Sequence, residues 1–105
     1  MIVVLESGTL SLTEYNDFKR FSFLYLDTNQ PQPGPGPFGI EFTSDGHVWI
    51  PISTIVALRY VEATEHWHRQ FHAMIDKARP YGWIDEAGGR IRAHIELARN
   101  SHASS

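Results

Sequence analysis

Residues 61–79 carry two patterns at helical spacing, and these constrain the fold more than any other part of the chain. Apolar side chains recur at intervals of three and four residues, which places them on one stripe of a helix. Pro80 and Gly82 follow at positions where a helix ends. The pattern predicts an amphipathic helix over residues 62–79 that packs on one face of a sheet. The stripe consists of Tyr60, Trp67, Phe71, Met74, Ile75 and Ala78.

A second stripe of the same helix is polar and contains Glu65, His68, His72 and Asp76. With an advance of about 100° per residue, Glu65 and His72 point within about 20° of each other. Two imidazoles one turn apart, together with a carboxylate, suit a divalent transition metal such as zinc, nickel, copper or iron(II). The competing interpretation is a solvated helix face, and on that interpretation no cofactor is expected.

Several segments have the composition or alternation of strands. Residues 2–5 and 9–10 read as two short strands around a turn, and the aromatic-rich residues 21–26 as a buried strand. Residues 40–42 and 48–50 flank turn residues and predict a hairpin. Pro51 places the return strand at a sheet edge or ends it there. Residues 54–61 are β-rich and predict a third strand of this unit, with a helix from Ser53 as the alternative.

Two further segments have competing signals. Ser11 and Glu14 have the spacing of a capping box, which predicts a short helix over residues 12–20. Polar and apolar side chains alternate strictly over residues 90–97, which favours a strand, although the amino-acid composition of this segment favours a helix. On the strand interpretation Arg90, Arg92 and His94 share one face. That row could receive an anion or an acidic partner, but alternation alone also produces a solvated face.

A proline- and glycine-rich segment, residues 28–37, divides the chain. Its four prolines lack the spacing of a polyproline ligand, so we expect an exposed loop within a single domain of residues 1–99. Residues 100–105 are polar and are expected to form a flexible tail.

Asp45 and His47 flank Gly46 in the predicted hairpin turn. A carboxylate two positions from an imidazole can orient it for general base catalysis. The same triplet is also common in ordinary turns. No serine stands in a nucleophile-elbow context, so a hydrolase triad has no anchor.

Composition limits the remaining function classes. The chain has 105 residues, no cysteine and a net charge of −3. Disulfides and thiolate chemistry are therefore excluded, and the charge is too mild for a nucleic-acid footprint. No apolar run approaches the roughly 18 residues that span a bilayer. The first residues meet Glu6 too early for a secretory signal, which indicates a cytoplasmic protein without a membrane partner.

Together these patterns predict an α+β domain, in which an antiparallel meander sheet carries one main helix and a possible short N-terminal helix. A chain this short leaves much apolar surface exposed, so we expect a homodimer. The favoured function is a small non-catalytic binding or assembly module that acts as a homo-oligomer, with a protein or a small molecule as its partner. The alternative is a metal- or histidine-dependent enzyme that uses Glu65, His68 and His72.

Overall fold

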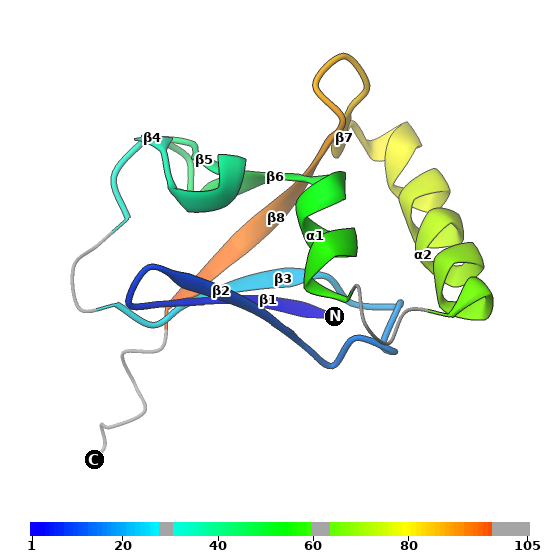
Figure 1. The fold of residues 1–105 in the computed structure, drawn as a ribbon. Coiled ribbons are helices and arrows are strands. Elements are labelled where there is room, and N and C mark those ends of the chain that lie inside the picture. The colour runs from blue at the N-terminus through cyan, green and yellow to red at the C-terminus, as the bar shows by residue number, and fades with distance from the viewer. Residues whose placement is uncertain (28–30, 60–63, 98–105) are drawn as a thin grey trace.

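The computed structural model describes residues 1–27, 31–59 and 64–97. Figure 1 shows an α+β fold in which one curled sheet carries helices on one face. The strand order is β2-β1-β3-β8-β6-β5-β4, and β7 pairs separately with β8. The strands are β1 (Ile2–Glu6), β2 (Thr9–Thr13), β3 (Ser22–Tyr25), β4 (Gly34–Pro35), β5 (Glu41–Phe42), β6 (His47–Pro51), β7 (Ile84–Asp85) and β8 (Arg90–Leu97). The helices are α1 (Ile52–Leu58) and α2 (Glu65–Ala78), with short 3₁₀ turns at Pro37–Gly39 and Arg79–Tyr81.

The sheet is mixed, so the predicted antiparallel meander is wrong in its finer detail. β1 pairs with β3 and β3 pairs with β8 in parallel, whereas the other pairings are antiparallel. The first hairpin closes through Ser7 and Gly8, both at positive φ, as a two-residue turn of this kind requires. The longer connection after β2 then carries the chain back so that β3 runs in the same direction as β1. β3 would run in this direction in a meander as well; the sheet is mixed because β3 pairs with β1 instead of with β2.

The helix predicted over residues 12–20 is absent. Thr13 ends β2, Glu14 adopts a left-handed φ of 52°, and residues 15–21 form a connection. Ser11 is paired with Val4 in the first hairpin, so it cannot cap a helix. Strand pairing with a neighbour that is close in the sequence has overridden the capping signal.

The predicted hairpin is present, with Phe42 opposite Val48 and Glu41 opposite Trp49. β6 lies inside the sheet, between β8 and β5, and Pro51 ends it. The strand predicted over residues 54–61 is wrong as far as Leu58, because the chain forms α1 there; residues 60 and 61 lie outside the described residues. The β-branched residues misled the prediction, while Ile52, Ile55 and Val56 have the spacing of a helix and all contribute to the core.

The main helix is confirmed as α2, which begins at Glu65; residues 60–63 are not described. The Thr64 hydroxyl caps the helix by accepting a hydrogen bond from the Trp67 amide at 3.0 Å. Trp67, Phe71, Ile75 and Ala78 are buried, as the stripe predicts. After the 3₁₀ turn, Gly82 adopts a φ of 78° and redirects the chain toward β7.

Part of the proline-rich segment belongs to the sheet rather than to an exposed loop. Gly34 and Pro35 form β4 and pair with β5. The Gly36 amide donates to the Ile40 carbonyl, and a Cβ on Gly36 would lie 2.8 Å from the Phe42 ring. Residues 28–30 of this segment and the predicted tail lie outside the described residues.

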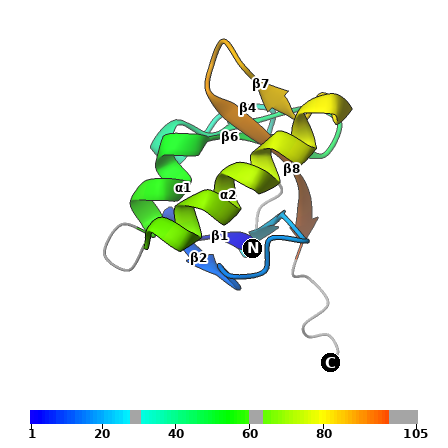
Figure 2. The ribbon, with the colours of Figure 1, turned by 90° about the vertical axis from the view of Figure 1, so that its right-hand side faces the viewer.

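Residues 90–97 form a strand, which settles the competing helix interpretation. β8 is the central strand of the sheet, and its alternation leaves Ile91 and Ala93 buried while His94 and Glu96 are exposed. Figure 2 shows α1 and α2 side by side across one face of the sheet, where the core lies. The largest fully buried side chains are Phe23, Phe71, Met1, Ile40, Ile50, Ile55, Ile91, Val3 and Val48.

Candidate ligand-binding groove

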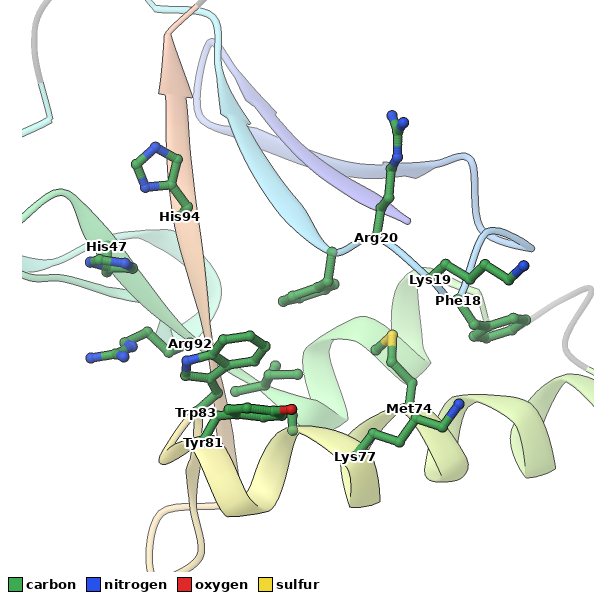
Figure 3. A pocket seen from close by; sticks show the side chains of 13 residues that line it. Phe18, Lys19, Arg20, His47, Met74, Lys77, Tyr81, Trp83, Arg92 and His94 are labelled. Carbon is green, nitrogen blue, oxygen red and sulfur yellow. The ribbon is translucent and has the colours of Figure 1, made fainter.

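A groove opens along one edge of β8, at the point where the pairing partner of this strand changes from β7 to β3. β7 pairs with Arg90 and Ile91, and β3 pairs with the strand from His94 onward. Arg92 and Ala93 lie between these two neighbours, so the sheet is split beside them. The groove there has a volume of about 530 Å³, which is in the range of sites for small organic ligands (Figure 3).

The apolar floor and walls of the groove come from four parts of the chain. The connection before β3, the second half of α2, the connection before β7 and β8 itself all contribute. Tyr81 and Trp83 stack with their ring centroids 5.0 Å apart, and they remain 69% and 44% exposed. Exposed aromatic rings in a hollow offer apolar area to a ligand. The apolar lining consists of Phe18, Phe21, Met74, Ala78, Tyr81, Trp83 and Ile91.

The polar lining of the groove is entirely basic within the described residues. Lys19, Arg20, Lys77 and Arg92 line it together with His47 and His94, and no Asp or Glu of the described ranges does so. Among residues 1–27, 31–59 and 64–97, no carboxylate lies within ion-pair distance of any of these four cations. The groove is thus locally positive in a chain whose net charge is −3. Such a site attracts anions.

Arg20 differs from the other cations because it also borders a neighbouring hollow. That hollow is lined by Glu14, Asp17 and Glu96 as well as by Arg20. In Figure 3 the side chains of Arg20 and Arg92 both extend away from the centre of the groove, so it is the acidic surroundings of Arg20 that set it apart. Lys19, Lys77 and Arg92 are therefore the cations on which anion binding would depend most.

The wall that carries Phe18 and Lys19 is held by contacts to distant residues. The Met1 ammonium donates to the carbonyls of Asp17 at 2.6 Å and Arg20 at 2.9 Å, and burial lowers the pKa of this amino group. The indole Nε1 of Trp67 donates to the Tyr15 carbonyl at 2.8 Å. These bonds satisfy backbone groups that no helix or strand satisfies, and they fix the connection over the groove.

Asp45 and His47 are brought together as the sequence suggests, at the end of the groove beside β6. Asp45 Oδ1 lies 3.3 Å from His47 Nδ1 and also accepts a hydrogen bond from the Thr43 hydroxyl. The Thr43 hydrogen bond, followed by the contact with His47, lowers the pKa of Asp45. The His47 ring meets the His94 ring edge to face, with centroids 5.5 Å apart. General base catalysis by this pair stays a prediction.

Arg90, Arg92 and His94 share one face of β8 but do not have the same surroundings. Arg90 donates to Asp85 at 2.8 and 3.0 Å and to Glu41 at 2.7 Å, so its charge is compensated within the protein. Arg92 and His94 line the groove. Two of the three predicted anion-binding residues therefore lie at the site and one does not.

The predicted metal ligands on α2 lie outside the groove. Glu65 pairs with Arg69 at 3.4 Å, and Asp76 bonds Arg79. Within the described ranges no group of three His, Asp or Glu side chains is placed to hold a metal ion. Metal binding through His68 and His72 stays a prediction.

Sequence reasoning missed most of the groove, because its lining comes from segments far apart in the chain. One signal was present: Lys19 and Arg20 are the only lysine and arginine among the first 58 residues, and they stand between Phe18 and Phe21. Two adjacent cations flanked by aromatic rings are unusual for a buried helix or strand and favour a surface site.

The structure is thus an α+β domain with a groove whose lining is basic and aromatic. The chain matches no protein-family model, no curated protein and no solved structure. None of the helices in the described ranges has the length and apolar character needed to cross a bilayer.

Proposed function

We propose that the protein is a non-catalytic binding module whose groove binds an organic anion with an apolar body. The observation that carries this proposal is the composition of the groove, in which uncompensated cations surround an aromatic floor. An anion gains from Lys19, Lys77 and Arg92, and an apolar body gains by covering Trp83 and Phe21. Neither a simple inorganic anion nor a neutral apolar molecule would use both features.

Binding rather than catalysis is supported by the chemistry of the lining. Among its described residues the only ionisable groups besides the cations are the two histidines and the Tyr81 hydroxyl. The basic set is also small for a nucleic acid, whose binding is dominated by many phosphate contacts.

A fluorescent anion tests the proposal directly. Anilinonaphthalene sulfonate carries a sulfonate on an aromatic body, and N-phenyl-1-naphthylamine is its uncharged relative. We expect the sulfonate to bind, and the Lys77→Gln, Arg92→Gln double variant to bind it at least about tenfold more weakly, because each charge-assisted contact contributes about 1.5–3 kcal/mol. The uncharged relative should bind both proteins equally.

The matched control is Arg69→Gln, which removes a cation from the exposed side of α2. It should leave sulfonate binding unchanged. Melting curves establish that every variant is folded. Equal sulfonate affinity for the wild type and the double variant would refute the proposal.

We also propose that the protein self-associates through β2, as the size of the chain suggests. The sheet ends in β2 on one side and β4 on the other. β4 is two residues long and contains Pro35, features that protect an edge from further pairing. β2 is five residues long and contains no charge and no proline, and Thr9, Ser11 and Thr13 are exposed. A second copy of β2 can add to this edge in antiparallel orientation.

A further inference from the structure

The basic side chains of the groove form two groups at opposite ends. In Figure 3, Lys19 and Lys77 lie at the end near Phe18 and Met74, while Arg92, His47 and His94 lie at the end formed by β6 and β8. Between the two groups lie the rings of Trp83 and Tyr81, which belong to the apolar lining. The order along the groove is therefore basic, apolar, basic.

We propose that the groove binds a small organic diacid, with one acidic group at each end of an apolar body. This inference rests on the proposed function and narrows its ligand class. Charge complementarity carries it: a monoanion would neutralise one end and leave the cations of the other end facing an apolar chain. A diacid compensates both ends and places its apolar middle over the rings.

The two ends differ in the acid geometry that they favour. Arg92 presents a planar guanidinium that can hold a carboxylate through two parallel hydrogen bonds. Lys19 and Lys77 present compact ammonium groups on flexible stems, which adapt to ligands of different length. Arg92 should therefore hold one acidic group of the ligand in a fixed orientation. Lys19 and Lys77 should bind the other acidic group over a limited range of ligand lengths.

A small molecule fits the groove better than a protein segment. The volume of about 530 Å³ is that of a site for a small ligand. The walls also come from several elements packed around the site, whereas an extended peptide is usually bound along an open edge or a long channel.

Calorimetric titration with two matched series tests the inference. One series consists of straight-chain dicarboxylates of increasing length, and the other of monocarboxylates of the same lengths. We expect the affinity of the dicarboxylates to pass through a maximum at one length. At that length the dicarboxylate should bind at least about tenfold more tightly than the monocarboxylate, as one additional charge-assisted contact implies.

Variants at the two ends make the test specific. Arg92→Gln and Lys77→Gln should each reduce dicarboxylate affinity to about that of the monocarboxylate, and Arg69→Gln should leave it unchanged. Arg92→Lys should weaken dicarboxylate binding about tenfold, because an ammonium group cannot form the two parallel hydrogen bonds of a guanidinium.

The failure of this inference is distinguishable from the failure of the proposed function. If monocarboxylates and dicarboxylates of each length bind equally well, and both are weakened by Arg92→Gln, the diacid is excluded while anion binding stands. If a peptide of alternating glutamate and leucine binds more tightly than every dicarboxylate, the ligand is a protein segment and the inference is overturned. If no carboxylate and no naphthalene sulfonate binds, both proposals fail.

Discussion

Arg90 and Arg92 occupy the same face of β8 two positions apart, yet they have different surroundings. Arg90 donates hydrogen bonds to Asp85 from β7 and to Glu41 from β5, so it ties three strands of the sheet together. Arg92 lies over the Trp49 ring at 5.9 Å and has no carboxylate partner among the described residues. The neighbours, which come from distant segments, compensate the charge of Arg90 but not that of Arg92 within the described residues.

The Asp85–Arg90 pair should make stability depend on pH. Two hydrogen bonds from Arg90, followed by one from the Gly88 amide, lower the pKa of Asp85 below 3.8. Because the folded pKa is lower than the unfolded one, the stabilisation is fully present above about pH 4 and is lost as the pH falls through the folded pKa. Asp85→Asn should therefore lower the melting temperature at neutral pH. The difference from the wild type should shrink progressively in acid.

Circular dichroism melting curves at neutral pH and at about pH 3 check this prediction. Glu6→Gln is the control, because Glu6 is exposed and has no ion-pair partner among the described residues. It should change the melting temperature little at either pH. A difference for Asp85→Asn that grows on acidification would contradict the assigned sign.

At the scale of single elements, α2 is anchored by one aromatic residue in particular. Phe71 is fully buried and stacks on Trp67, with ring centroids 4.9 Å apart. Phe71→Ala should lower the free energy of unfolding by about 3–5 kcal/mol, because it removes buried area and leaves a cavity. Urea denaturation measures this loss. Gln70→Ala on the exposed side of α2 should stay within about 0.5 kcal/mol of the wild type.

The metal hypothesis for α2 can be tested on the same helix. If His68 and His72 bind a divalent ion, zinc or nickel should bind the wild type at neutral pH, and affinity should fall in acid because the imidazoles must be neutral. The His68→Ala, His72→Ala double variant should lose this binding. Calorimetry with each protein measures it. Equal weak binding by both proteins would leave the polar stripe as a solvated helix face.

Elements with local signals were predictable, and those decided by distant partners were not. The hairpin of β5 and β6, the helix α2 and the strand β8 each follow from a periodic pattern within their own residues. The structures of residues 12–13 and of α1 did not follow from their own sequence patterns. Pairing with β1 placed residues 12–13 in a strand, and packing against the core favoured a helix for α1. The parallel pairing of β3 with β8 depends on partners far apart in the sequence, which no local pattern encodes.

The candidate site was predictable to the same limited extent. Arg92 and His94 follow from the alternation of β8, because this alternation places them on one face. Nothing in the sequence distinguished Lys77 from the other polar residues of the helix. Lys19 lies in a segment that we predicted to be helical. The groove arises only when three packed segments meet beside β8, so its charge pattern is a property of the tertiary structure.

At the scale of the whole molecule, the free edge at β2 predicts the oligomeric state. We expect light scattering after gel filtration to give a mass twice that of one chain. Ser11→Lys places a lysine from each copy close to its counterpart in an antiparallel β2 pair, and the repulsion should shift the equilibrium toward the monomer. Gln32→Lys beside β4 should not do so. A wild-type monomer at high concentration would contradict the prediction.

The central position of β8 has a consequence for biosynthesis. Without this strand the sheet separates into two parts, β2-β1-β3 and β6-β5-β4, which have no strand in common. A nascent chain emerges from the ribosome with its N-terminus first, so neither part can join the other until residues 90–97 have left the exit tunnel. Sheets whose strands pair between residues far apart in the sequence fold slowly, on a scale of about milliseconds to seconds. The complete sheet should therefore form only after β8 has left the exit tunnel, and the exposed strands must be protected from aggregation until then.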